Sequence, residues 1–177
     1  MQKKFMIYMI GRSGSGKTTL ANALAEELRK REICCPQVID GDVIRKQFGD
    51  IFGFTYEERM KCNQAVRVVV QYLLENGISV ILAQVAAYEE IRRKVREQFQ
   101  EEYIEIYIKC SYEECVRRDT KGYYLKQQEG QMAHLNGADD IFEIPLSSNI
   151  VIDTETETVC GAIDQIITYL EAKGYGV

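Results

Sequence analysis

The stretch Gly11–Thr18 reads GRSGSGKT and matches the pattern GxxxxGK[ST] of a phosphate-binding loop. It follows the apolar run 4–10 (KFMIYMI), which is typical of a buried strand. It precedes residues 18–31, where leucines recur every four residues, as in an amphipathic helix. A preceding strand and a following helix are the context that this motif requires. The sequence therefore predicts a nucleotide-binding site, and a chance glycine-rich turn is the weaker interpretation.

The residue types of this loop suit a nucleoside triphosphate. Glycines let backbone N–H groups approach phosphate oxygens, and the start of a helix adds a favourable dipole. Lys17 is expected to reach the β- and γ-phosphates, and the Thr18 hydroxyl is expected to ligate Mg²⁺. The residues assigned to ATP binding are Gly11, Ser13, Gly14, Ser15, Gly16, Lys17, Thr18 and Thr19.

Strand-like and helix-like segments alternate along the rest of the chain. Further strands are expected at 38–40, 78–82, 104–109 and 149–153. Further helices are expected at 42–48, 55–76, 88–99, 111–118 and 157–173. This order predicts an α/β fold of the P-loop type, with a mostly parallel five-stranded sheet sandwiched by helices in one domain, 1–177. The segment from about 119 to 145 is too long for a simple connection and is expected to be a mobile lid.

Composition excludes several classes of partner. The chain has 22 Lys and Arg against 27 Asp and Glu, a formal net charge of -5, which argues against nucleic acid as the main partner. No apolar run approaches the roughly 20 residues needed to span a bilayer. We expect a cytoplasmic protein that binds neither membrane nor nucleic acid.

The kind of phosphate-loop protein can be narrowed further. The guanine-recognition motif NKxD of GTP switches is absent, and 177 residues are few for a motor. A small-molecule kinase is favoured, because it needs only the nucleotide-binding core, an acceptor pocket and a lid.

The expected second strand ends in Asp40-Gly41-Asp42, at the sheet edge where such folds bind ligands. One carboxylate could face magnesium or its waters, and the other the hydroxyl that accepts the phosphate. Asp42 is the candidate base or hydroxyl-orienting group, although it could instead cap the next helix. Arg45, one turn later, could bind an anionic acceptor or form a surface ion pair with Asp42 or Glu57.

Several separated motifs resemble those of the adenylylsulfate kinase family, whose members transfer the γ-phosphate of ATP to the 3'-hydroxyl of adenylyl sulfate. The loop GRSGSGKTT is similar to the family's GxSGSGKST. The other matching stretches, in order, are IDGDVIR at 39–45 (LDGDxxR), FGFTYEER at 52–59 (LGFSxxDR), RDTKGYY at 118–124 (RDPKGLY) and FEIP at 142–145 (YExP). Together they cover nearly the whole chain.

The resemblance implies a role for each matching position. Asp42 would act at the acceptor hydroxyl, Arg118 would lie near ATP, and Lys121 would reach the phosphoryl groups from the lid. The expected catalytic residues are Asp42, Lys17 and Lys121. The residues expected to bind the substrate are Asp40, Arg45, Phe54, Arg59, Gln84 and Leu135. Of these, the resemblance implies that Phe54 stacks on the base and that Arg45 and Arg59 contact the anionic part of the acceptor. The resemblance also suggests a homodimer.

The chain departs from the family on the acceptor side. AQVAAYE at 83–89 replaces SxISPYR, KCNQA at 61–65 replaces ENIRR, and AHLNG at 133–137 replaces KGFTG. Each lost charge-assisted hydrogen bond to a buried anion costs about 1.5 to 3 kcal/mol, so the acceptor could differ. One alternative acceptor is cytidine diphosphoramidate, a capsule precursor phosphorylated on its ribose by a related kinase. Gln84 could read a base edge through its amide, or only pack at a strand end.

Two other functions remain open at this point. A nucleotide-binding regulator without catalysis would have no evident need for Asp42 and Lys121 beside Lys17 and Thr18. A kinase of a non-nucleotide metabolite, such as a sugar acid, would dispense with Phe54.

Overall fold

Five strands form one sheet in the computed structural model, which describes residues 3–129 and 142–175. The strands are β1 (Met6–Ile10), β2 (Gln37–Asp40), β3 (Val80–Gln84), β4 (Tyr103–Lys109) and β5 (Ile150–Asp153). Their order is β2-β3-β1-β4-β5, and every neighbouring pair is parallel. The predicted α/β fold with a five-stranded parallel sheet is confirmed.

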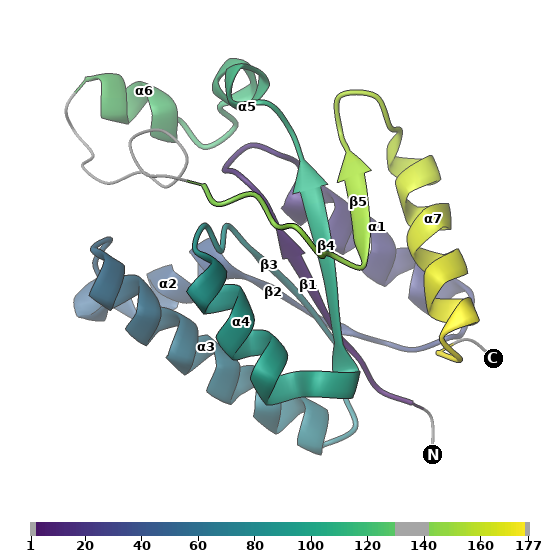
Figure 1. The fold of residues 1–177 in the computed structure, drawn as a ribbon. Helices are drawn as coiled ribbons and strands as arrows, with labels where there is room; N and C mark the ends of the chain where they lie inside the picture. Colours follow the sequence, from purple (N-terminus) through teal and green to yellow (C-terminus); the bar gives the residue numbers. More distant parts are fainter. Residues whose placement is uncertain (1–2, 130–141, 176–177) are drawn as a thin grey trace.

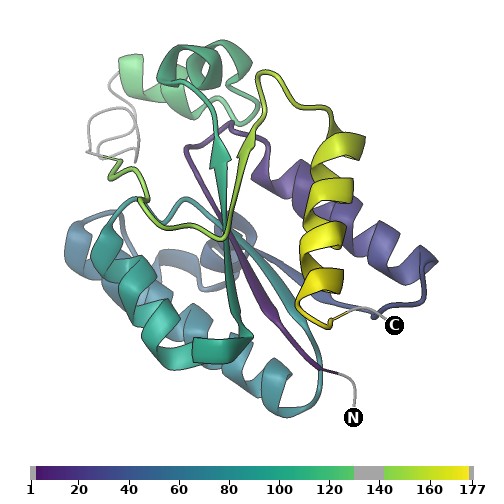
Figure 2. The same cartoon turned by 45° about the vertical axis from the view of Figure 1, so that its right-hand side comes forward.

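Helices connect the strands and cover both faces of the sheet (Figures 1 and 2). The helices are α1 (Lys17–Lys30), α2 (Gly41–Gln47), α3 (Tyr56–Glu75), α4 (Glu89–Phe99), α5 (Tyr112–Arg118), α6 (Tyr123–Gln128) and α7 (Val159–Ala172). Two short 3₁₀ turns, η1 (Gly49–Ile51) and η2 (Gln100–Glu102), follow α2 and α4. The sheet is thus the middle of three layers, as expected for parallel strands joined by helices.

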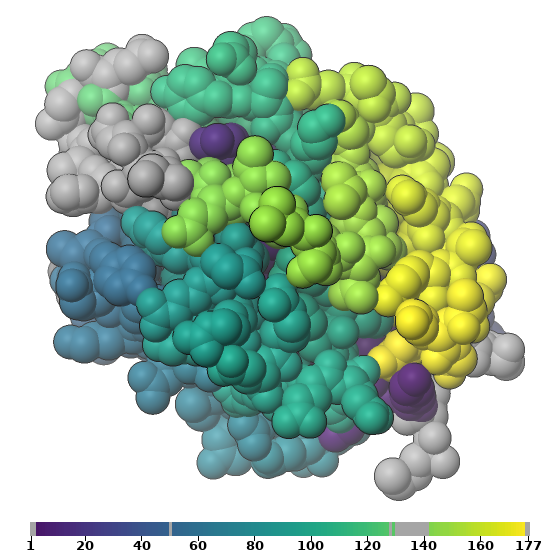
Figure 3. All heavy atoms as spheres, in the orientation of Figure 1, coloured from purple at the N-terminus to yellow at the C-terminus, as the bar shows by residue number. Residues whose placement is uncertain are grey.

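The two apolar cores follow from the alternation of side chains along the strands. On one face, Leu24 of α1 and Ile166 of α7 pack with Ile7 and the other inward side chains of that face. On the other face, Val66 of α3 and Val95 of α4 pack with their counterparts from the strands. In the space-filling view of Figure 3, the segment 142–149 runs between α4 and α5.

The start of β3 differs from the sequence-based expectation by two residues. Ile78 still belongs to the turn that terminates α3, because its N–H group bonds to the carbonyl of Leu73 while Gly77 N–H bonds to that of Leu74. Gly77 has the positive φ (78°) of such a helix termination. The strand therefore begins only at Val80.

The segment expected to be a lid contains a helix that the sequence did not reveal. Helix α6 begins after Gly122, whose φ of 65° is left-handed, and it is only six residues long. A helix this short leaves no periodic apolar pattern to detect. Residues 130–141 of the expected lid lie outside the described residues, so its mobility stays a prediction.

No helix within the described ranges is long and apolar enough to cross a membrane. The carboxyl ends of all five strands meet at one edge of the sheet, where α5 and α6 also lie (Figure 1). This edge gathers the residues that the sequence singled out.

Candidate active site

The phosphate-binding loop connects β1 to α1 and depends on its glycines. Gly14 and Gly16 have φ values of 78° and 99°, which favour glycine. A Cβ atom on Gly11 would lie 2.4 Å from the carbonyl oxygen of Ile108, on the neighbouring strand. The loop can take this shape against the sheet only without these side chains.

Lys17 is buried at the first position of α1. Its Nζ atom donates to the carbonyl oxygens of Gly11, at 2.9 Å, and Arg12, at 2.5 Å. Burial lowers the pKa of Lys17 from 10.5 to about 8; nearby Asp42 opposes this shift and nearby Lys121 adds to it. A negative phosphate would favour its charged form.

Asp40 joins the phosphate-binding loop to α2. Its Oδ2 atom accepts a hydrogen bond from the Thr18 hydroxyl at 2.6 Å, and its Oδ1 atom accepts from the N–H groups of Asp42 and Val43. Asp40 therefore caps α2, and the interpretation of Asp42 as the cap is wrong. Partial burial disfavours the charged carboxylate, but the Thr18 bond, the charge of Lys121 and the backbone donors hold the pKa of Asp40 below its usual value.

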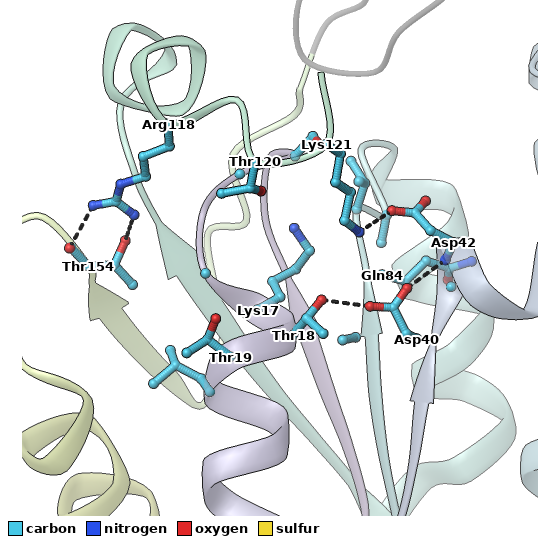
Figure 4. Close-up of a pocket in the computed structure, with 18 of the residues that line it drawn as sticks. Lys17, Thr18, Thr19, Asp40, Asp42, Gln84, Arg118, Thr120, Lys121 and Thr154 are labelled. Carbon is cyan, nitrogen blue, oxygen red and sulfur yellow. Dashed lines mark hydrogen bonds and ion pairs between the residues drawn. The ribbon is translucent and has the colours of Figure 1, made fainter. Parts of the chain in front are cut away.

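The Asp42 side chain points instead across the cleft to Lys121 (Figure 4), with 2.5 Å between Oδ2 and Nζ. Desolvation alone would lower the pKa of Lys121, but the hydrogen bond and charge of Asp42 raise it above its usual value. Lys121 is therefore a cation. Together with Lys17, it places two ammonium groups beside one carboxylate.

Arg118 anchors the far side of the phosphate-binding loop through Thr154, which follows β5 directly. The guanidinium donates to the hydroxyl oxygen of Thr154 at 3.1 Å and to its carbonyl oxygen at 2.9 Å (Figure 4). The Thr154 hydroxyl in turn donates to the carbonyl of Ser15 at 3.0 Å. The sequence analysis missed Thr154, although its place at the carboxyl end of a strand is the signal that drew attention to Asp40.

The acceptor side is built around Phe54. The guanidinium carbons of Arg45 and Arg59 lie 5.0 and 5.5 Å from the centre of its ring. Arg45 donates to the carbonyls of Phe52 and Gly53, and within the described residues it forms no ion pair with Asp42 or Glu57. The surface ion-pair interpretation of Arg45 is therefore wrong.

Most of the expected site residues line one cleft of about 620 Å³. Gly11 and Ser15 are buried in the loop and do not contribute to its wall, and Leu135 lies outside the described residues. The cleft walls also include residues that the sequence analysis did not single out: Lys46, Thr120, Tyr123, Thr154, Val159 and Ala162. Thr120 and Tyr123 lie within the motif at 118–124 but were given no role there, and Val159 and Ala162 belong to α7, which carries no motif.

A parallel sheet, a phosphate-binding loop at its edge and an ammonium-paired carboxylate facing that loop define a P-loop kinase. The family model described as adenylylsulphate kinase matches residues 3–153. The chain therefore belongs to the adenylylsulfate kinase family.

Individual relatives agree with this assignment. The adenylyl-sulfate kinase of Pseudomonas entomophila is 38% identical over 169 residues, which cover 95% of this chain and 81% of that protein. The probable adenylyl-sulfate kinase of Aeropyrum pernix is 35% identical over 175 residues, or 97% of this chain and 95% of that protein. The structure of Mycobacterium tuberculosis APS kinase CysC in complex with AMPPNP and APS superposes with a TM-score of 0.88 at 25% identity, covering 97% and 99% of the two chains.

Family membership confirms the predicted enzyme class, an ATP-dependent phosphotransferase with an alcohol group as acceptor. The relatives do not favour a catalytically inactive regulator or a cytidine nucleotide as acceptor.

Proposed function

We propose that this enzyme transfers the γ-phosphate of ATP to the 3'-hydroxyl of adenylyl sulfate. The observation that carries the proposal is the position of Asp42: its carboxylate lies between the phosphate-binding loop and the acceptor side of one cleft, and it is paired with Lys121. Such a group can face a hydroxyl and a γ-phosphate at the same time.

The donor half of the cleft would bind ATP. Backbone N–H groups of Ser13, Gly14 and Gly16 surround the phosphates, and Lys17 neutralises their charge. Thr18 and Thr19 extend the loop into α1, and Arg118 lies on the side of Thr154. Charge neutralisation and positioning supply most of the catalysis in phosphoryl transfer.

The residues next to Lys17 also fit a magnesium ion. Mg²⁺ prefers oxygen ligands and is often held by one or two side chains together with substrate phosphates. The Thr18 hydroxyl and the Asp40 carboxylate both offer oxygen atoms as metal ligands, and these oxygens lie 2.6 Å apart. The lowered pKa of Asp40 keeps its carboxylate ionised. Thr18 would hold the ion directly, with Asp40 beside it, and the ion would offset the charge of the phosphates.

The chemical step would depend on Asp42 and Lys121. Asp42 accepts a hydrogen bond from the acceptor hydroxyl and so orients its oxygen toward the γ-phosphorus. Lys121 moves from Asp42 to the transferring phosphoryl group and stabilises its charge. The hydroxyl proton passes to Asp42 as the new P–O bond forms, and the bond from the γ-phosphorus to the β,γ-bridging oxygen breaks, so that ADP leaves.

The acceptor half would bind adenylyl sulfate. Phe54 offers an aromatic face to the base, and Arg45 and Arg59 offer guanidinium groups to the phosphate and sulfate. Asp40 and Gln84 lie at the ends of the neighbouring strands β2 and β3, on the same side. A contact from Leu135 stays a prediction.

We further infer that residues 1–177 act as one kinase domain with a lid at about 119–145. We also infer a cytoplasmic location, where the ATP that the reaction consumes is available. A homodimer is inferred from family membership, and sedimentation of the purified chain tests it.

The decisive experiment measures ATP consumption and identifies the product by mass, with adenylyl sulfate and a panel of adenine and cytidine nucleotides as acceptors. We expect a 3'-phosphorylated product from adenylyl sulfate and much slower turnover of the others. Turnover of a cytidine diphosphate derivative in its place would overturn the proposed acceptor but keep the kinase chemistry.

A further inference from the structure

Three polar side chains from three different elements meet behind the acceptor half of the cleft. They are Tyr8 of β1, Asn63 of α3 and Gln84 at the end of β3. The Oε1 atom of Gln84 accepts hydrogen bonds from the Tyr8 hydroxyl at 2.7 Å and from the Asn63 amide nitrogen at 3.1 Å. Tyr8 and Asn63 are buried, with 0% and 2% of their surface exposed.

This arrangement fixes the orientation of the Gln84 amide. The Asn63 nitrogen also lies 3.4 Å from the Tyr8 hydroxyl oxygen, so the single hydroxyl proton is directed to Gln84. Burial, together with the charge of Glu105, holds the pKa of Tyr8 far above its usual value, and the hydroxyl therefore keeps this proton. A flipped Gln84 amide would set its own N–H groups against the Asn63 N–H donor and leave the Tyr8 hydroxyl proton without its acceptor, which is unfavourable.

The nitrogen of the same amide is left available. Within residues 3–129 and 142–175, no group accepts a hydrogen bond from Gln84 Nε2. This nitrogen is not among the buried side-chain atoms that lack a partner, so its surface is accessible. Gln84 lines the cleft, so its two N–H donors are open to it.

The position of this amide is close to the reacting groups. Ala83 pairs with Asp40 on the neighbouring strand, and Gln84 follows it directly. Figure 4 shows the Gln84 side chain next to Asp40 and Asp42. A Cβ atom on Gly41 would lie 2.9 Å from Gln84 Cγ, so the glycine between the two aspartates makes room for this side chain. An acceptor nucleotide held next to Asp42 would therefore meet the Gln84 amide.

We propose that Gln84 is a specificity-determining residue, whose amide donates a hydrogen bond to an uncharged acceptor atom of the nucleotide that receives the phosphate. That atom is a ring nitrogen of the base or the ribose 2'-oxygen. Tyr8 and Asn63 are positioning residues that hold the amide in this orientation. The inference rests on the proposed function, and Asn63 stands where the family pattern ENIRR has an apolar isoleucine.

Calorimetric binding of adenylyl sulfate to the ADP-loaded full chain tests this inference. Gln84→Met keeps the length of the side chain but removes the donor, and we expect it to weaken adenylyl sulfate binding by about 3- to 10-fold. The Kd for ADP should not change. Gln71→Met, on the exposed side of α3, is the matched control and should change neither value.

Analogues of adenylyl sulfate locate the accepting atom. One set replaces a single adenine ring nitrogen by carbon, and another lacks the 2'-hydroxyl. The analogue that lacks the accepting atom should bind the wild-type chain as weakly as adenylyl sulfate binds the Gln84→Met variant. The same analogue should bind the Gln84→Met variant no more weakly than that. Tyr8→Phe should weaken binding in the wild-type background but not in Gln84→Met, a coupling that a purely structural role would not produce.

An unchanged Kd in Gln84→Met, or additive losses with every analogue, would overturn the inference while leaving the proposed function intact. Tight binding of adenylyl sulfate without turnover would contradict the proposed function and not the Gln84 contact. If the wild-type chain does not bind adenylyl sulfate, both are wrong.

Discussion

Lys121 and Asp42 are 79 residues apart in the chain, yet their side chains form an ion pair across the cleft. More than a third of each side chain is exposed, 36% for Lys121 and 38% for Asp42. Ion pairs with this exposure contribute at most about 1 kcal/mol, because water competes for both charges. The pair can therefore separate at little cost when a phosphoryl group and a hydroxyl arrive between its members.

The Asp42→Asn variant tests the catalytic role of this carboxylate. We expect kcat to fall by roughly 100-fold or more, because the amide is a much weaker base for the hydroxyl proton. The Kd for ATP should stay within about threefold, since Asp42 does not cap α2 and the loop remains intact. Steady-state kinetics and nucleotide titration give both values, with Glu97→Gln, in an exposed ion pair with Arg93, as a control. A variant with near-normal kcat would exclude Asp42 as the hydroxyl-orienting group.

Asp40 combines a structural and a proposed functional role, and two substitutions separate them. Asp40→Ala removes the helix cap and should lower the free energy of unfolding by about 1 kcal/mol. Asp40→Ser can still cap α2 and should recover most of that loss in urea unfolding. Both variants lack the carboxylate beside Thr18, so both should need more Mg²⁺ for half-maximal activity. If the serine variant had a normal Mg²⁺ requirement, Asp40 would be only a cap.

The sequence predicted those parts of the molecule that depend on neighbours in the chain. The phosphate-binding loop, its flanking strand and helix, and the Asp40-Gly41-Asp42 turn have local signals, because backbone geometry and phosphate chemistry both restrict the residues at these positions. All five strands were located, and the one at 78–82 was displaced because the α3 termination extends through Ile78.

Features that depend on contacts between distant segments were not predictable in this way. Thr154 acquires its role only because β5 lies beside β4, which brings its hydroxyl to the carbonyl of Ser15. The Tyr8, Asn63 and Gln84 group combines a strand, a helix and another strand, and each residue alone looks like ordinary packing. Such groups appear only when the sheet order is known.

Lys17 should make nucleotide binding dependent on pH. Its pKa is about 8 in the fold against 10.5 for an ordinary lysine, so the free enzyme loses this charge as the pH rises above 8. An unfolded chain would still hold the proton there, so the cost of burying this charge, fully present below a pH of about 8, is relieved as the pH rises toward 10.5, and the stability of the fold increases with pH over that window. Bound phosphates favour the charged form, so metal-free ADP binding at a pH of about 9 should take up a proton.

Calorimetry in buffers of different ionisation enthalpy measures that proton uptake. Lys17→Met should abolish it as well as weaken binding, whereas uptake that persists in this variant would assign the proton to another group.

The last prediction concerns Arg92, which is 1% exposed and lies behind the acceptor half of the cleft. Its Nη1 atom donates to the carbonyl of Ala86 at 2.8 Å, and Ala86 has a left-handed φ of 46° that strains a residue with a Cβ atom. Arg92→Met should lower the free energy of unfolding by about 2 kcal/mol and raise the KM for the acceptor more than the KM for ATP, because the cleft wall at Ala86 loses its support. Ala86→Gly, added to that variant, should recover part of the acceptor KM, since glycine takes this φ without strain. Arg93→Met, on the exposed side of α4, should change neither KM. Equal increases of both KM values in Arg92→Met, with no recovery from glycine, would mean that Arg92 only stabilises the fold.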